Sequence, residues 1–254
     1  MIVIWRNCCF PRKKVLVSLV PPSFTNAVVA VALFASGGSF GTGSSEAVNA
    51  REPIAITFMR HAESAGNVSG VIDTSVPGPE LTEKGRNQAQ VAADTFSKLD
   101  YDGVYASTMI RTQQTADPMA KAVDATVEVL PGLQEIEAGE FDGKPEEEGR
   151  VAYAATSDWL KGNRDARIPG GIDGNEFDQR FDSAVEKIYA SGDTHPIVFS
   201  HGASIPTWVL MNVRNPDLTL VTTDRLPNTG YIVITGTPET GWTLTDWNGK
   251  NISQ

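Results

Sequence analysis

Residues 54–61, IAITFMRH, place an arginine and a histidine directly after a short apolar run. A run of this length and composition predicts a strand buried in a sheet. A second short run, residues 196–199, ends in the same way at Ser200-His201-Gly202. Because ligands of open α/β sheets bind beyond the carboxyl ends of the strands, we expect His61 and His201 to lie at a ligand-binding edge.

Strand and helix patterns alternate along the rest of the body. The expected strands are residues 54–59, 103–106, 126–130 and 196–199, with a closing hairpin or edge pair at 231–235 and 242–245. The expected helices are residues 82–99, 108–123, 145–160, 175–190 and 204–211, the first of them capped by Thr82 and burying Ala89, Ala92, Ala93, Phe96 and Leu99. The alternation predicts one three-layer α/β/α domain over residues 51–254, with a mostly parallel central sheet.

Composition and charge narrow the possible partners. The chain has 254 residues, of which 41% are hydrophobic and 20% charged, and its formal net charge is −10 at pH 7. Residues 1–50 hold four Lys or Arg residues and one acidic residue, so the acidic excess lies in the body. An acidic body without a basic stripe argues against a nucleic-acid partner and against docking on an anionic membrane. Both cysteines precede residue 51, which excludes thiolate zinc sites and disulfides from the body.

Residues 1–50 are interpreted as an export leader, so the protein is expected in the cell envelope or outside the cell. A positive run at 12–14 precedes apolar runs at 15–20 and 27–35, and Val48-Asn49-Ala50 suits cleavage by signal peptidase. The second run is shorter than the roughly 20 residues that span a bilayer. Two alternatives are an uncleaved membrane anchor over about residues 15–35 and a start codon assigned too far upstream.

Five segments of the body carry a family resemblance. They are residues 60–63 (RHAE), 81–89 (LTEKGRNQA), 104–116 (VYASTMIRTQQTA), 133–143 (LQEIEAGEFDG) and 198–202 (VFSHG). In this order they resemble the histidine phosphatase superfamily, whose fold is phosphoglycerate mutase-like. The likeness extends over residues 54–250. The family's commonest first triplet is Arg-His-Gly, and this chain departs from it with Ala62.

The resemblance implies a phosphate site and a nucleophile. His61 is implied to attack phosphorus, and a neutral imidazole can form a covalent intermediate that divides one hard step into two. The residues implied to hold the phosphate are Arg60, Asn67, Arg111, His201 and Gly202. Arginine's planar guanidinium suits bidentate contact with phosphate. Arg60 and His201 are therefore also counted among the catalytic groups.

The reaction also needs a proton donor for the leaving oxygen. A carboxyl group can protonate that oxygen and later deprotonate the attacking water. The resemblance favours Glu135, and Glu63, Glu137 and Glu140 are rival carboxyl groups. His195 precedes the strand that His201 follows, so the two lie at opposite strand ends and do not form a metal site.

The expected activity is therefore hydrolysis of a small phosphorylated substrate by a metal-independent histidine phosphatase without a cofactor. The stretch from residue 140 to 200 is too short for the long insertion of phosphoglycerate mutases, and the C-terminal tail is short. Mutase-like phosphoryl transfer and a non-catalytic module that binds phosphorylated ligands are the alternatives. The sequence carries no signal for an oligomeric state.

Overall fold

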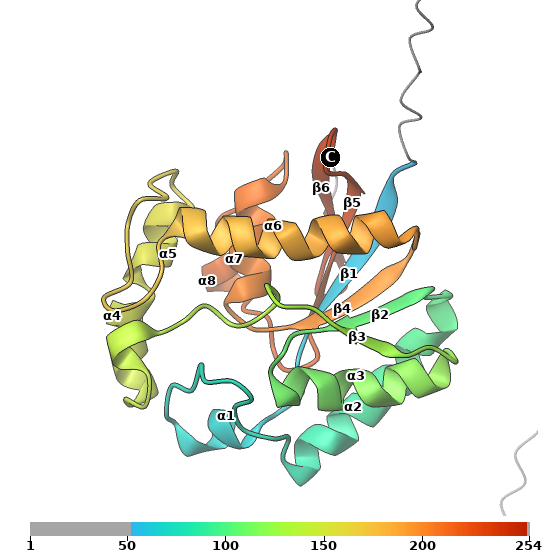
Figure 1. Cartoon of the computed structure of the whole chain (residues 1–254), viewed down its shortest axis with the longest axis horizontal. Helices are drawn as coiled ribbons and strands as arrows, with labels where there is room; N and C mark the ends of the chain where they lie inside the picture. Colours follow the sequence, from blue (N-terminus) through green and yellow to red (C-terminus); the bar gives the residue numbers. More distant parts are fainter. Residues whose placement is uncertain (1–51, 253–254) are drawn as a thin grey trace, which may run out of the picture. The chain divides into compact units, whose positions relative to one another are not determined.

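Seven strands form one mixed sheet in the order β3-β2-β4-β1-β5-β6-β7 (Figure 1). The computed structural model describes residues 52–252, so the predicted leader of residues 1–50 lies outside the described residues. The strands are β1 (Ile54–Arg60), β2 (Gly103–Ala106), β3 (Val127–Val129), β4 (Pro196–Ser200), β5 (Tyr231–Thr237), β6 (Gly241–Trp247) and β7 (Lys250–Asn251). The first four strands in chain order are parallel, and the last three continue the sheet antiparallel. The predicted parallel centre and closing hairpin are confirmed.

Helices of different lengths connect the strands. They are α1 (Ala65–Ser69), α2 (Glu83–Phe96), α3 (Ile110–Ala122), α4 (Gly149–Ala152), α5 (Ala154–Trp159), α6 (Gly174–Ser191), α7 (Ser204–Asn212) and α8 (Leu220–Thr223). The expected N-cap is correct, because Thr82 Oγ1 accepts a hydrogen bond from Gly85 N at 2.9 Å. Among the described residues, no helix is both long enough and apolar enough to cross a membrane.

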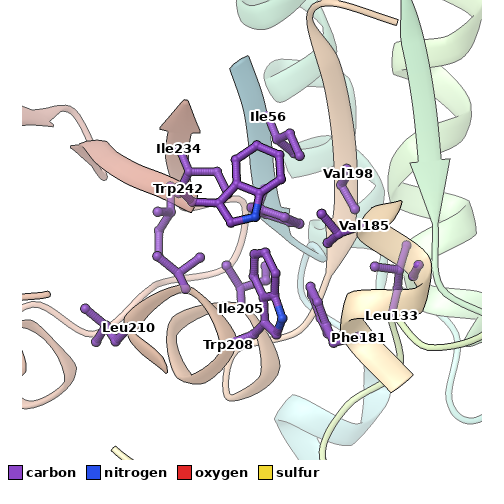
Figure 2. Packing of buried hydrophobic residues seen from close by; sticks show 14 of the residues in the cluster. Ile56, Leu133, Phe181, Val185, Val198, Ile205, Trp208, Leu210, Ile234 and Trp242 are labelled. Carbon is purple, nitrogen blue, oxygen red and sulfur yellow. The ribbon is translucent and has the colours of Figure 1, made fainter. Parts of the chain in front are cut away.

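The side chains of β1 contribute apolar residues to both faces of the sheet. Ile56 and Phe58 belong to the larger apolar cluster, which includes residues of α6 and α7, whereas Met59 belongs to the cluster with α2 and α3. Successive strand residues point to opposite faces, so one strand serves two apolar layers. Figure 2 shows Phe181 of α6 and Trp208 of α7 packed below the sheet, and their rings stack with centroids 5.0 Å apart. One helical layer on each face of the sheet gives the three layers of the predicted domain.

Two details of the expected helices are wrong. Residues 145–160 are not one helix, but a 3₁₀ turn at Glu146–Glu148 followed by α4 and α5. The start of this segment pairs with a distant loop instead, because Glu146 N donates to Gly70 O at 2.9 Å and Val71 bridges to Pro145. The helix α2 ends at Phe96, so Leu99 lies on a following 3₁₀ turn and is 58% exposed.

Candidate active site

Parallel pairing of β1 with β4 brings the two predicted histidines together. Arg60 lies opposite Ser200 in the register, and His61 N donates to Ser200 O at 2.9 Å. The ring centroids of His61 and His201 are 5.2 Å apart, with the rings edge to face. Both side chains are buried, with 3% and 0% of their surface exposed. The expected ligand-binding edge is therefore a buried histidine pair at the carboxyl ends of two adjacent strands.

The hydrogen bonds of His61 determine its tautomer. Its Nδ1 lies 2.7 Å from Ala62 O, which can only accept, so the proton is assigned to Nδ1. Its Nε2 accepts a hydrogen bond from Arg111 Nε at 3.2 Å and so presents a lone pair. Burial, followed by the charges of Arg111 and Arg60, lowers the pKa of His61 well below its ordinary value. The ring is therefore neutral at physiological pH, as a nitrogen nucleophile must be.

The backbone around His61 is held by two other elements. Thr115 of α3 accepts from Ala62 N at 3.0 Å through its hydroxyl, which donates in turn to Arg111 O at 2.6 Å. Asn228, in the loop before β5, donates from Nδ2 to His61 O at 3.0 Å. The loop after β1 is thus tied to α3 on one side and to the β5 loop on the other.

Three buried polar atoms around this pair have no hydrogen-bond partner within residues 52–252. They are Arg60 Nε, Arg111 Nη1 and His201 Nδ1. Another nitrogen of Arg60 has a partner, since Nη1 donates to Leu226 O at 2.8 Å. A buried donor without an acceptor costs about 1–3 kcal/mol. Two such guanidinium donors beside a neutral imidazole have the chemistry to bind an oxyanion.

Two glycines allow the guanidinium groups to reach this position. A Cβ atom on Gly202 would lie 2.8 Å from Arg60 Nε. A Cβ atom on Gly78 would lie 2.8 Å from Arg111 Nη1, and Gly78 also has a φ of +70°. The absence of a Cβ atom on Gly202 therefore leaves room for Arg60, and Gly78 does the same for Arg111, whereas a contact of Gly202 with phosphate stays a prediction.

Glu135 reaches the site from the loop after β3. Its Oε1 accepts from Ser204 N at 2.9 Å and from Ser204 Oγ at 2.8 Å, and its Oε2 accepts from Ala203 N at 3.1 Å. These donors belong to the start of α7, where the positive end of the helix dipole also favours a carboxylate. Burial lowers the pKa of Arg60 and of Arg111, and the negative charge of Glu135 partly offsets this by raising both pKa values. The carboxylate of Glu135 therefore lies near both guanidinium groups.

Comparison with known proteins identifies the family. The profile of the histidine phosphatase superfamily (branch 1) matches residues 56–250. This chain belongs to the histidine phosphatase superfamily. The PE-PGRS family protein PE_PGRS11 of Mycobacterium tuberculosis is 39% identical to it over an alignment of 215 residues that covers 78% of this chain. The match spans only 37% of that longer relative.

Solved structures share the fold of this histidine phosphatase domain. A mycobacterial glucosyl-3-phosphoglycerate phosphatase superposes with a TM-score of 0.64 at 20% identity, over 78% of this chain and all of the other. The phosphoserine phosphatase of Entamoeba histolytica, in complex with 3-phosphoglyceric acid, superposes with a TM-score of 0.62 at 25% identity, over 77% of this chain and 97% of the other.

The rival carboxyl groups of the histidine phosphatase domain are engaged elsewhere or face solvent. Glu63 accepts from Lys84 Nζ at 2.6 Å and from Thr82 Oγ1 at 2.9 Å. Glu137 forms an ion pair with Arg180 at 3.3 Å. Glu140 is exposed. Of the four carboxyl groups that the sequence left open, Glu135 is the one bonded to the turn that follows the second histidine.

Asn67 lies beside the site but is used in a helix cap. Its Oδ1 accepts from Ser64 N at 3.1 Å and from Asn228 Nδ2 at 3.2 Å, as part of a capping box at the start of α1. A phosphate contact through its amide nitrogen stays a prediction.

His195 is exposed and precedes β4, so it lies at the far end of the strand from His201, as expected. Within residues 52–252, no three His, Cys, Asp or Glu side chains are grouped to hold a metal ion.

Sequence reasoning missed two residues that shape the site. Arg180 of α6 donates to Gly132 O at 2.7 Å and to Glu135 O at 2.9 Å, and so holds the loop that carries Glu135. Asn228 joins the backbone of His61 to Asn67. The turn-forming residues 227–230 (PNTG) before β5 are a local signal for a loop at this place, whereas nothing local marks the arginine on a long amphipathic helix.

Proposed function

We propose that this histidine phosphatase domain hydrolyses small phosphomonoesters through a phosphohistidine on His61, with Glu135 as the proton donor. The observation that carries the proposal is the neutral Nε2 of His61, whose lone pair lies beside buried guanidinium donors of Arg60 and Arg111 that lack partners in the described chain. This combination of an uncharged nucleophile and concentrated positive charge suits attack on a phosphoryl group.

The first half of the reaction transfers the phosphoryl group to the enzyme. Nε2 of His61 attacks phosphorus, and the bond from phosphorus to the leaving oxygen breaks with its electron pair going to that oxygen. Glu135 gives the oxygen a proton, so an alcohol leaves. In the second half a water attacks the phosphohistidine, the N–P bond breaks, and Glu135 takes the proton of the water. The products are inorganic phosphate and the original enzyme.

The arginines supply the charge stabilisation that the proposed reaction needs without a metal ion. Preorganised donors aimed at the equatorial oxygens of the transferred group are worth several kcal/mol of barrier. Arg60 comes from β1 and Arg111 from α3, so the two guanidinium groups approach from different elements. Both relatives with solved structures described above are named as phosphatases of small phosphorylated molecules, which supports the same substrate class here.

Hydrolysis of an aryl phosphate in the presence of a chelator tests the proposal. Wild type and a His195→Ala control, altered at the exposed histidine on the far side of β4, should be equally active. His61→Ala should lose activity by at least a thousandfold while its circular dichroism is unchanged. Rapid quenching in alkali should trap acid-labile phosphate on wild type alone. A folded His61→Ala variant with full activity, or activity that chelation removes, would refute the proposal.

A further inference from the structure

A chain of buried hydroxyl groups contacts Nε2 of His201, whereas Nδ1 of the same ring has no hydrogen-bond partner within residues 52–252. Ser107, which directly follows β2, has its Oγ 2.9 Å from His201 Nε2 and 2.9 Å from Thr112 Oγ1. Met109 N donates to the same Ser107 Oγ at 3.1 Å. Thr112 Oγ1 lies 2.7 Å from Met109 O. His201, Ser107 and Thr112 all have 0% exposure, so bulk solvent does not reach these bonds.

Counting protons along this chain assigns each of them. Thr112 Oγ1 lies 2.7 Å from Met109 O and 3.2 Å from Ser107 O, and both carbonyl oxygens can only accept, so the hydroxyl proton of Thr112 goes to the shorter of these two contacts. The contact between the two hydroxyl groups then needs the proton of Ser107. Ser107 Oγ has no further proton to donate, so its contact with His201 needs a proton on Nε2. In this arrangement these four contacts each contain one proton, and only the longer contact of Thr112 Oγ1 with Ser107 O contains none.

The consequence is that the two histidines of the pair hold opposite tautomers. His61 carries its proton on Nδ1, bonded to Ala62 O, and presents Nε2 to the guanidinium group of Arg111. His201 carries its proton on Nε2, bonded to Ser107, so the buried Nδ1 holds a lone pair when the ring is neutral. A lone pair repels the oxygen of a phosphate. To donate a hydrogen bond to the oxyanion, Nδ1 of His201 must first gain a proton.

We propose that Ser107 and Thr112 lock the tautomer of His201, so that the site takes up one proton at His201 Nδ1 whenever it binds a tetrahedral oxyanion. The inference rests on the phosphate site of the proposed function and assigns Ser107 and Thr112 as positioning residues. For an ester dianion the proton comes from solvent. For an ester monoanion it moves from the P–OH group to Nδ1. In both cases the bound state is an imidazolium beside a dianion.

The charges around His201 agree with uptake on binding. His61 and Arg60 come from the β1 end, Arg111 from α3 and Arg180 from α6, and each of them disfavours a positive ring. Burial is the largest cause, and together these influences lower the pKa of His201 well below its ordinary value. The carboxylate of Glu135, at this end of α7, is bonded to Ala203 and Ser204. The empty site is therefore neutral at His201, and an arriving oxyanion is the charge that favours its protonation.

The tautomer can be read directly, because the chain has only three histidines. Ring ¹⁵N–¹H correlation spectra of the full chain without ligand should show a proton on Nδ1 of His61 and on Nε2 of His201. Adding inorganic sulfate should make both ring nitrogens of His201 protonated. A ligand-free His201 with its proton on Nδ1, or with both nitrogens protonated, would overturn the inference on the wild-type protein alone.

Proton uptake is counted by calorimetry with sulfate, which carries no proton of its own near neutral pH. Binding enthalpies at pH 7 in two buffers of different ionisation enthalpy should give about one proton taken up per sulfate in wild type. The sulfate affinity should then fall by about tenfold for each unit of rising pH. Thr112→Val removes the acceptor of the Ser107 hydroxyl proton. Ser107 can then donate that proton to His201 Nε2, so the imidazole carries its own proton on Nδ1 and can donate it to the anion.

Thr112→Val is therefore expected to take up less than half a proton per sulfate, with a pH dependence below threefold per unit. Thr95→Val is the matched control, since its hydroxyl donates to Val91 O on the exposed side of α2, and it should behave as wild type. Ser107→Ala removes the same lock if the first variant does not fold. Equal uptake by wild type and a folded lock variant would overturn the inference.

These outcomes are separate from those of the proposed function. An enzyme that hydrolyses aryl phosphates through His61 but shows the Nδ1–H tautomer of His201 keeps the proposed function and loses this inference. A protein that binds sulfate with proton uptake but hydrolyses nothing keeps the inference and loses the proposed function.

Discussion

Replacement of Glu135 by glutamine separates the hydrogen bonding of this side chain in the structure from its proposed part as proton donor. The carboxylate accepts hydrogen bonds from Ile136 N and from Ser204 N at 2.9 Å, from Ser204 Oγ at 2.8 Å and from Ala203 N at 3.1 Å. Three of these bonds converge on Oε1. The glutamine oxygen should therefore take the Oε1 position, which turns the new NH₂ group toward the N–H of Ala203.

The stability cost follows from that one misplaced donor. A hydrogen bond to a charged group contributes about 1.5–3 kcal/mol. For a domain of about 200 residues, each kcal/mol shifts Tm by about 2–4 °C, so we expect Glu135→Gln to unfold about 3–12 °C below wild type. The catalytic cost is separate: loss of a general acid slows a reaction by about 10²–10⁴-fold, and less when the leaving group needs no proton.

The assay compares kcat/KM for an alkyl and an aryl phosphate in wild type and Glu135→Gln, with thermal unfolding of both proteins. The alkyl substrate should lose at least a hundredfold and the aryl substrate less than about tenfold. Glu137→Gln is the control, because Glu137 is paired with Arg180 at 3.3 Å and is 44% exposed, so its loss should cost less than about 1 kcal/mol. Equal losses on both substrates would refute Glu135 as the acid, and an unchanged Tm would refute the reasoning about α7.

Three further predictions concern the neighbours of the site. Gly202→Ala places a Cβ atom 2.8 Å from Arg60 Nε. It should raise KM about tenfold, which corresponds to about 1.4 kcal/mol, and leave Tm nearly unchanged. An unaltered KM would show that the guanidinium can move aside. Asn228→Ala removes the donor to His61 O and should lower the free energy of unfolding by about 0.5–1.5 kcal/mol in denaturant titration, whereas a wild-type midpoint would show that water replaces it. Because the pKa of His61 and of His201 is lowered well below 6.5 in the folded protein, the unfolded chain binds more protons below that pH. Stability should be full above about pH 6.5 and fall below it by up to about 1.4 kcal/mol per pH unit for each histidine, and a flat profile between pH 7 and 5 would contradict this.

Much of the architecture could be predicted because its signals are local. The apolar runs that end at Arg60 and Ser200 are buried strands, and the alternation of strands with helices produced the expected layers. The failures have non-local causes. Residues 145–160 read as a helix, but their first residues are drawn into pairing with the loop after α1, some 75 residues earlier in the chain. Leu99 falls on the apolar face only if α2 continues past Phe96, where it ends.

The candidate site divides in the same way. Its residue types lie in short motifs, so the resemblance of those motifs to the family predicts the histidines, the two arginines and Glu135. Their supports were not named. Arg180 is an ordinary charged residue on an amphipathic helix until α6 packs over the loop of Glu135 and its guanidinium meets three carbonyl groups of residues 132–135.

By itself the sequence determined which chemical groups are present and that two strands deliver histidines to one edge of a sheet. That information is local, because strand periodicity and short motifs depend on neighbouring residues. The tertiary structure alone decided which ring nitrogen of each histidine carries the proton. His61 donates to the next residue in the chain, but His201 bonds to Ser107, 94 residues away. A tautomer follows the nearest acceptor in space, and only the folded chain brings that acceptor into contact.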